Sequence, residues 1–192
     1  MAFGQAEAFA ALRGRVSAET LAHSERVAET AAQVATSYGV DPTTARVAGL
    51  LHDWCKECDG AGLVAAARRR NLPVTDADLR VPYLLHASVG AAEVREALPG
   101  VGADVLDAIA AHTCGAPVMT DLAMVVYIAD AIEPGRTHDG VQALRSAVGP
   151  VPLHELFART YTVSFRHLVD ARRCIHPVTT AVWNALVAGT SR

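Results

Sequence analysis

The sequence is poor in aromatic residues, in excess charge and in long apolar runs. Aromatic residues make up 5% of the 192 positions, and 17 basic against 20 acidic side chains leave a formal net charge of −3. This balance argues against a large electrostatic contact with nucleic acid or anionic lipid, so we expect neither partner. No apolar run reaches the length of a membrane span, and residues 1–7 lack the basic start of a signal peptide. We therefore expect a cytoplasmic protein.

Cysteine is also scarce, and the 4 cysteines do not form a recognisable ligand set. Cys55 and Cys58 have the CxxC spacing of zinc knuckles and redox pairs. The second CxxC, CxxH or HxxxH pair that a zinc site needs is missing, and Cys114 and Cys174 stand alone. In a reducing compartment we expect all four to remain thiols.

The composition predicts a helical protein of one domain. Hydrophobic residues make up 51% of the chain and charged residues 19%, and the apolar share is mostly Ala, Val and Leu. These residues favour packed helices over sheet, and a chain of this length buries a core without disulfides or structural zinc. We expect an all-α, single-domain protein over residues 1–192, with its core at about 18–187.

Hydrophobic periodicity and capping residues place the helices. Ser17 is an N-cap candidate for a helix over 18–38 that Gly39 ends, and Asp41 followed by Pro42 opens a helix that runs to position 53. Segment 121–132 is almost continuously apolar, which predicts the central buried helix. The other expected features are helices over 6–15, 60–71, 104–112, 141–148, 153–175 and 179–187, a helix that starts within 81–90, and a loop at 72–76.

The basic run Arg68-Arg69-Arg70 closes the helix expected over 60–71. Arginine at a helix C-terminus complements the helix dipole, and clustered arginines most often face water. We interpret the run as a solvated helix end; the alternative is a phosphate-binding cluster.

Six imidazole and carboxylate side chains stand at the ends or on the buried faces of separate apolar segments. They are His23, His52, Asp53, His86, His112 and Asp130. One such histidine alone is usually a capping or core residue, but packing does not explain the set, because a buried ionised carboxylate costs several kcal/mol unless it is paired or bound to metal. The alternative for Asp130 is an ion pair with Arg136, which the loop 133–136 holds nearby. We interpret the remaining histidines at 138, 154 and 167 as surface or packing residues.

The order of these residues resembles a known family. His23, the His52-Asp53 pair and Asp130 follow the H…HD…D order of the HD-domain metal-dependent phosphohydrolases. A more specific resemblance, to the YqeK-type subfamily, covers about residues 18–185. It rests on Ala48-Gly49-Leu50-Leu51-His52-Asp53 with Lys56, on Leu85-His86, on His112-Thr113 with Gly115, on the segment from Tyr127 to Arg136 that reads YIADxIEPGR, and on Ile175-His176-Pro177.

The resemblance implies an HD-type helical bundle that hydrolyses diadenosine tetraphosphate symmetrically to two ADP, with iron as the expected metal. A shell of imidazole and carboxylate without thiolate suits iron, and also Mn, Co or Ni. His23, His52, Asp53 and Asp130 would hold one ion. Asp53 would bridge to a second ion held by His86 and His112, or these two histidines would contact phosphate directly.

Hydrolysis would proceed by in-line attack of a metal-bound hydroxide on phosphorus. Asp53, Lys56 and Arg136 are the candidate catalytic residues. Lys56 and Arg136 are the cations that the charge developing on the phosphoryl oxygens needs. Thr113 can donate a hydrogen bond. The resemblance further implies that residues 173–177 fold over the nucleotide. The expected substrate-binding set is His23, Asp53, Lys56, His86, His112, Thr113, Asp130, Arg136, Arg173, Ile175, His176 and Pro177.

Three other interpretations remain open. The same metal site could act on a nucleoside monophosphate or a cyclic nucleotide, although a GYP-type motif after His112 is absent. The chain could instead be a nucleotide-sensing module, against which the complete set of six candidate ligands argues. A purely structural helical protein would leave Asp130 unexplained. A homodimer is possible under each enzyme interpretation.

Overall fold

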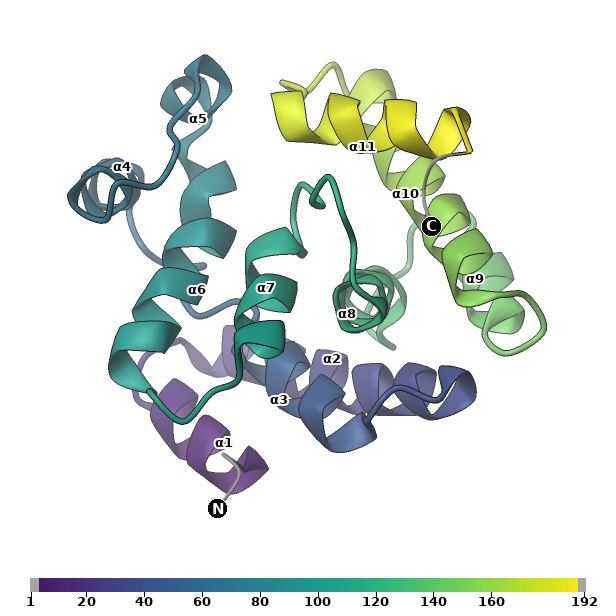
Figure 1. Cartoon of the computed structure of the whole chain (residues 1–192), viewed down its shortest axis with the longest axis horizontal. Coiled ribbons are helices and arrows are strands. Elements are labelled where there is room, and N and C mark those ends of the chain that lie inside the picture. The colour runs from purple at the N-terminus through teal and green to yellow at the C-terminus, as the bar shows by residue number, and fades with distance from the viewer. Residues whose placement is uncertain (1–3, 190–192) are drawn as a thin grey trace.

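The computed structural model describes residues 4–189, and this part of the chain is built from helices without a strand (Figure 1). The all-α prediction is therefore confirmed. No helix within these residues is long and apolar enough to cross a membrane. The elements are α1 (Gln5–Arg13), α2 (Ala18–Tyr38), α3 (Pro42–Leu51), α4 (Gly60–Arg69), α5 (Asp76–Arg80), the 3-10 helix η1 (Pro82–Leu85), α6 (His86–Ala97), α7 (Ala103–Ala111), α8 (Asp121–Ile132), α9 (Val141–Ala147), α10 (Leu153–Asp170) and α11 (Pro177–Val187).

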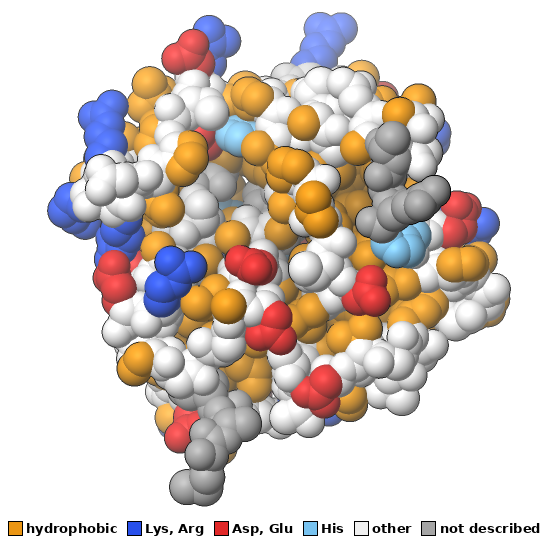
Figure 2. All heavy atoms as spheres, viewed as in Figure 1, with side chains coloured by type: hydrophobic (Ala, Val, Ile, Leu, Met, Phe, Trp, Pro, Cys, Tyr) orange, Lys and Arg blue, Asp and Glu red, His pale blue; other side chains and the backbone are white. Residues whose placement is uncertain are grey.

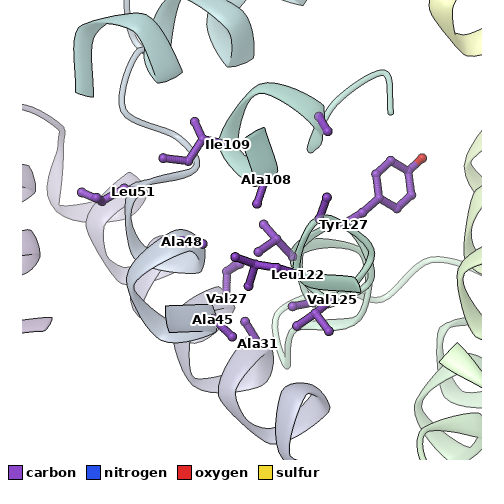
Figure 3. Close-up of a cluster of buried hydrophobic side chains, with 14 of the residues drawn as sticks. Val27, Ala31, Ala45, Ala48, Leu51, Ala108, Ile109, Leu122, Val125 and Tyr127 are labelled. Atoms are coloured by element: carbon purple, nitrogen blue, oxygen red, sulfur yellow. The ribbon is translucent and has the colours of Figure 1, made fainter. Parts of the chain in front are cut away.

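Helix α8 occupies the centre of the fold, as its apolar sequence predicts. Figure 1 shows it end-on, and it packs against α2, α3, α7, α9 and α10. Every residue from Leu122 to Ala129 is buried. Figure 3 shows side chains of α2, α3 and α7 meeting those of α8 in one cluster, among them Val27, Ala48 and Ile109. The polar residue near the end of α8, Asp130, is thereby held against the core.

Helices α2 and α3 form a hairpin whose ends the sequence specifies. The Ser17 hydroxyl accepts from Thr20 N at 3.2 Å, and Gly39 ends α2 with φ +72°. The Asp41 carboxylate caps α3, which begins with proline and ends at Leu51. His52 and Asp53 therefore lie in the turn that follows α3, as the predicted helix ending requires.

Gly49 lets the two helices of this hairpin approach closely. A Cβ at this position would lie 2.9 Å from Ala28 Cα and 3.1 Å from the Val27 carbonyl oxygen. These are backbone atoms, which cannot rotate away as a flexible side chain can. The glycine therefore sets the separation of α2 and α3 one turn before the candidate ligand pair.

Two stretches differ from the prediction. The expected loop is followed by a short helix, α5, which a capping box of Thr75 and Asp78 starts. The helix expected from 153 to 175 ends at Asp170, and Arg172 adopts a left-handed φ of +50°. Proline at 177 then holds the preceding residue extended and starts α11 two positions earlier than predicted.

The basic run at the end of α4 does not reach the candidate site. Arg70 donates to both carboxylate oxygens of Glu96, at 2.8 and 2.6 Å, and lies near Glu93. In Figure 2, Lys and Arg side chains gather along the edge where Figure 1 shows α4 and α5, while the rest of this face mixes charges of both signs with apolar side chains. The run is a solvated helix end with local ion pairs, which agrees with the first interpretation.

Candidate metal and nucleotide site

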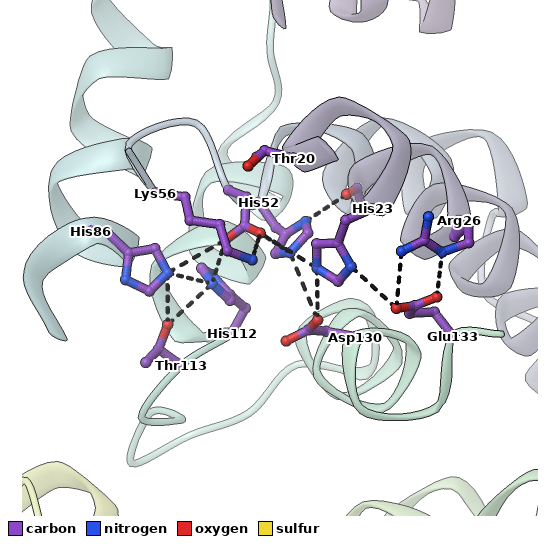
Figure 4. Close-up of polar contacts among 12 residues, drawn as sticks. Thr20, His23, Arg26, His52, Lys56, His86, His112, Thr113, Asp130 and Glu133 are labelled. Atoms are coloured by element: carbon purple, nitrogen blue, oxygen red, sulfur yellow. Dashed lines mark hydrogen bonds and ion pairs between the residues drawn. The ribbon is translucent and has the colours of Figure 1, made fainter. Parts of the chain in front are cut away.

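The fold brings the six predicted imidazole and carboxylate residues together (Figure 4). They come from five parts of the chain: His23 from α2, His52 and Asp53 from the turn after α3, His86 from the start of α6, His112 from the residue after α7, and Asp130 from α8. Five of the six are buried, and Asp130 is intermediate. Their convergence was the central prediction from the sequence.

Three of the four histidines are oriented by the same local hydrogen bond. Each ring donates from Nδ1 to the backbone carbonyl three residues earlier. Because a carbonyl only accepts, this bond places the proton on Nδ1 and leaves the Nε2 lone pair free to face the centre. The bonds run from His52 to Gly49 O (2.7 Å), from His86 to Tyr83 O (2.6 Å) and from His112 to Ile109 O (2.7 Å).

His23 is oriented by a buried carboxylate instead. Its Nδ1 lies 3.3 Å from Oε1 of Glu133, which is 2% exposed. Glu133 also accepts from Arg26 Nε at 2.7 Å and from Gly135 N at 2.6 Å. Glu133 was predicted only as part of the YIADxIEPGR motif; neither its contact with His23 nor its ion pair with Arg26 was predicted from the sequence. The histidine-to-glutamate separation of 110 residues left no local signal for this contact.

Asp53 lies between two groups of histidines. Its Oδ2 is 3.1 Å from His52 Nε2 and 3.4 Å from His23 Nε2. Its Oδ1 is 3.5 Å from His86 Nε2 and 3.7 Å from His112 Nε2. The two oxygens of one carboxylate thus face different pairs of imidazoles.

Asp130 forms the ion pair with Arg136 that was the alternative to metal binding, and it also faces the cluster. Arg136 donates from Nη2 to Asp130 Oδ1 at 2.5 Å and from Nε to its carbonyl oxygen at 2.8 Å. The same Oδ1 lies 3.1 Å from His23 Nε2. The loop after α8 therefore holds Arg136 beside the cluster, as predicted.

The donor set fits a divalent transition metal. The Nε2 atoms of His23 and His52 are buried and make no hydrogen bond, although carboxylate oxygens lie 3.1 to 3.4 Å away. The ligand atoms of His23, His52 and Asp130 lie within 4.8 Å of one another, and so do those of His52, Asp53 and His112. Buried nitrogens with free lone pairs, next to carboxylates and without thiolate, suit iron, manganese and similar ions.

Without a metal, burial favours the neutral form of His52, but Asp53 and Asp130 raise its pKa, so a proton on this imidazole takes the place that a cation would fill. Burial opposes ionisation of Asp53, but His52 overcomes it and holds the pKa of this carboxyl well below its usual range. The pKa of Asp130 is also lowered: burial again opposes ionisation, and His23, His52 and Arg136 outweigh it. Burial, together with the charges of His52 and His86, lowers the pKa of His112 to about 3. Ionised carboxylates and a neutral imidazole are the forms that bind metal.

Next to His86 and His112 the site carries groups suited to an anion. Lys56 Nζ lies 2.5 Å from Asp53 Oδ2 and is 29% exposed. The Thr113 hydroxyl lies 3.1 Å from His112 Nε2 and 3.3 Å from His86 Nε2. Tyr83 stacks on the His86 ring at 4.4 Å.

A cavity of about 1010 Å³ opens beside the cluster. Seven predicted site residues line it: Asp53, Lys56, His86, His112, Thr113, Asp130 and Arg136. His138 and His167, predicted to be surface or packing residues, are exposed but also belong to this lining. The two side chains line the cavity because α9 and α10 pack against α8.

The segment predicted to cover the nucleotide does not line the cavity in this structure. His23, Arg173, Ile175, His176 and Pro177 are not among the lining residues, and their contact with the nucleotide stays a prediction. His176 caps α11 by accepting from Val178 N at 3.1 Å, and its Nε2 lies 3.3 Å from Asp78 Oδ2. The start of α11 thus turns this imidazole toward α5.

The cysteines are free thiols, as predicted. Cys55 is buried and Cys58 is exposed. Burial and the neighbouring Cys58 raise the pKa of the Cys55 thiol far above its ordinary value. The candidate ligand groups within residues 4–189 include neither cysteine, and so the CxxC pair takes no part in the site.

A family model described as HD domain matches residues 20–135, which contain all six candidate ligands. The chain belongs to the HD-domain family. HD domains are metal-dependent, which agrees with the donor set described above. The match ends one residue before Arg136.

Relatives of this HD protein match beyond the family model. A protein of Bacillus subtilis (strain 168), named symmetrical bis(5'-nucleosyl)-tetraphosphatase, is 31% identical over 96% of this chain and 98% of its own. A Halalkalibacterium halodurans protein of the same name is 33% identical over 86% of this chain and 87% of its own. A crystal structure from Clostridium acetobutylicum, described as a predicted HD superfamily hydrolase involved in NAD metabolism, superposes with a TM-score of 0.89 at 30% identity and covers 98% of this chain and 100% of that one.

Proposed function

We propose that this protein is a metal-dependent hydrolase that cleaves dinucleoside tetraphosphates symmetrically, converting diadenosine tetraphosphate and water to two ADP. The observation that carries the proposal is the convergence of six imidazole and carboxylate ligands beside a cavity that Lys56, Thr113 and Arg136 also line. The relatives named symmetrical bis(5'-nucleosyl)-tetraphosphatase, which match nearly the whole chain, support this substrate.

The position of Asp53 supports two groups of metal ligands, both of which would include this carboxylate. Oδ2 faces His23 and His52, with Asp130 nearby, and Oδ1 faces His86 and His112. We propose iron as the resident metal, with Mn, Co or Ni able to replace it. When bound, the metal lowers the pKa of a coordinated water and neutralises charge on the phosphoryl oxygens.

The protein side chains bind and orient the phosphate chain. Lys56 contacts Asp53 and Arg136 contacts Asp130, so two cations beside the cluster are available to the four phosphates. The Thr113 hydroxyl can donate to a phosphoryl oxygen next to His86 and His112. Cations fixed in advance where charge develops stabilise the transition state of phosphoryl transfer.

Product analysis tests the proposal. Protein loaded with Fe²⁺, Mn²⁺ or Co²⁺ is incubated with diadenosine tetraphosphate, and the nucleotides are separated by chromatography. We expect ADP as the sole product. AMP plus ATP would contradict symmetrical cleavage, and absence of turnover with each metal would contradict the enzyme. Asp53→Ala should abolish turnover while the helical circular dichroism spectrum is retained.

Assays with a wider panel of nucleotides test the other interpretations. Faster hydrolysis of a nucleoside monophosphate or a cyclic nucleotide than of diadenosine tetraphosphate would assign the site to that substrate. Nucleotide binding by the metal-loaded protein without turnover of any panel member would identify a sensing module. The sequence left a homodimer open, and sedimentation of the purified protein can test it.

A further inference from the structure

We propose that the end of the cavity beyond Arg136 binds the second nucleotide of the dinucleoside substrate, the half that leaves, with Arg166 as its phosphate-binding cation. This inference rests on the proposed function. We call this end the distal subsite and define it by His138, Asp139, Gly140, Arg166, His167 and Asp170. It lies between the loop joining α8 to α9 and the C-terminal half of α10.

The cavity wall extends along α10 away from the cluster. At one end, Tyr161 donates to the carbonyl of Cys114 at 2.8 Å, next to Thr113 of the candidate site. From there the lining continues along the helix to Asp170. The helix rises about 14 Å from Tyr161 to Asp170. A cavity of this length can accommodate one nucleotide in addition to a nucleotide at the cluster.

The loop between α8 and α9 forms the opposite wall. A Cβ at Gly140 would lie 3.9 Å from Val163 Cγ2 of α10, which places this loop against the helix. The His138 Nε2 lies 2.9 Å from the carbonyl oxygen of Ala131, the residue after Asp130. The distal subsite is thus continuous with the Asp130 and Arg136 side of the cluster.

The volume of the cavity suits a ligand with two nucleosides. Pockets for single drug-sized ligands measure roughly 300 to 1,000 Å³. The cavity of about 1010 Å³ is at the upper limit of that range, although the candidate catalytic residues occupy only one part of its wall. A single nucleoside diphosphate beside the cluster would leave the distal subsite open.

Arg166 is an exposed cation without a partner among the residues that the structure describes. The guanidinium groups of Arg136, Arg145 and Arg159 donate to carboxylates or carbonyls of the protein. The Arg166 side chain, in contrast, makes no hydrogen bond or ion pair with any residue between 4 and 189. An unpaired guanidinium in a cavity wall offers its planar set of donors to a phosphate.

The other groups of the distal subsite suit the nucleoside end of the ligand. Both ring nitrogens of His138 lie near backbone carbonyl oxygens, at 2.9 and 3.1 Å, so the ring offers its face to a base. Asp139 and Asp170 repel a terminal phosphate and accept hydrogen bonds from ribose hydroxyls. The subsite therefore favours a phosphate that carries a nucleoside over free inorganic phosphate.

One nucleotide position at the cluster and one in the distal subsite would also set where the substrate is cut. Each nucleoside holds two phosphates between itself and the centre of the chain. Water adds to one of the two central phosphorus atoms, the central phosphoanhydride bond breaks, and the departing oxygen takes the electron pair with the second ADP. Arg166 would hold that departing ADP, so it is a specificity residue and touches no reacting atom.

Charge reversal at Arg166 tests the assignment. We compare Arg166→Glu and Arg166→Ala with Arg159→Glu and Arg159→Ala, because Arg159 lies two turns earlier on α10, pairs with Glu155 and is outside the cavity. The Mn²⁺-loaded proteins are assayed with diadenosine tetraphosphate and with adenosine 5'-tetraphosphate, which has one nucleoside. We expect Arg166→Ala to raise KM about tenfold for the dinucleotide, with kcat nearly unchanged, and to leave KM for the mononucleotide within twofold.

Titration with ADP gives a readout that does not need turnover. Wild-type protein should bind two ADP per chain and Arg166→Glu one, while both Arg159 variants bind two. Equal increases in KM for both substrates, unchanged KM for both, or two ADP sites retained in Arg166→Glu would overturn the distal subsite. Lack of hydrolysis by wild-type protein that still binds two ADP would contradict the proposed function and leave the subsite supported.

Discussion

The chemistry of the site depends on how each imidazole is held from its outer side. Three histidines donate from Nδ1 to a carbonyl three residues earlier, and His23 donates to Glu133. The Nε2 atoms converge because all four outer nitrogens are occupied. Groups that fix a metal-binding histidine from behind typically affect metal affinity by 10- to 100-fold.

Replacing Glu133 should therefore weaken metal binding. Glu133→Gln keeps the side-chain volume but removes the charge that pairs with Arg26 and orients His23. We expect Mn²⁺ affinity, measured by calorimetry, to fall about 10- to 100-fold. Glu29→Gln, on the exposed face of α2 and paired with Arg46, is the control and should change affinity by less than twofold. Unchanged affinity in Glu133→Gln would show that His23 needs no carboxylate.

The lowered pKa of His112 makes a prediction about the metal-free protein. The folded pKa is about 3, whereas an unfolded histidine titrates near about 6.5. The unfolded chain thus takes up this proton first, and the stabilisation is complete above about pH 6.5 and lost as pH falls toward 3. Urea unfolding of chelator-treated protein should show the stability of wild type relative to His112→Gln falling between pH 7.5 and 5. A constant difference would contradict this assignment.

Among the elements, the α2–α3 hairpin determines where the candidate ligands stand. α2 carries His23, and the end of α3 carries His52 and Asp53, so a change in their separation changes the distance between the ligands. The contact at Gly49 controls this separation, because the added Cβ would meet the backbone of Ala28. Substitution there affects stability and the site together.

Gly49→Ala should destabilise the protein although alanine is the better helix former. The added methyl group should cost about 1–3 kcal/mol in overpacking if the two backbones resist separation. The gain in helix propensity is about 1 kcal/mol, so the overpacking should prevail. We expect a lower urea midpoint and weaker Mn²⁺ binding. Gly14→Ala, with φ −85° and no atom within 4 Å of the added Cβ, is the control and should be neutral or stabilising. A more stable Gly49→Ala protein would show that the hairpin opens easily.

For the whole molecule, the cluster joins elements that are distant in the sequence. α2, α3, α6, α7 and α8 each supply or adjoin a candidate ligand. A metal that binds the folded protein but not the unfolded chain therefore stabilises the complete arrangement of these helices.

Metal removal should lower the melting temperature. With free metal at about 100 times its Kd, binding adds about 2.7 kcal/mol, which corresponds to roughly 5–10 °C for a chain of this size. Differential scanning calorimetry with Mn²⁺ and with excess chelator measures the shift. Asp53→Ala should lose most of it, because this carboxylate lies between both pairs of histidines. Equal melting temperatures with and without metal would contradict a metal site in this cluster.

The sequence alone determined the class of fold and the identity of the candidate ligands. Local signals were sufficient where interactions are local: Ser17 and Gly39 delimit α2, Asp41 and Pro42 start α3, and the apolar run of α8 predicts its burial. The H…HD…D order identified the family that the family model matches, because imidazole and carboxylate side chains are the ligands that the expected metals need.

Tertiary structure decided which distant groups support the site and where the cavity extends. Glu133 meets His23 across 110 residues, and His138 and Arg166 line one cavity only because α8, α9 and α10 pack together. The segment 173–177 carries a family motif yet lies outside the cavity, since Pro177 starts α11 and His176 caps it. Periodicity and capping act over a few residues, whereas these contacts depend on packing between whole helices, and that is why the sequence did not reveal them.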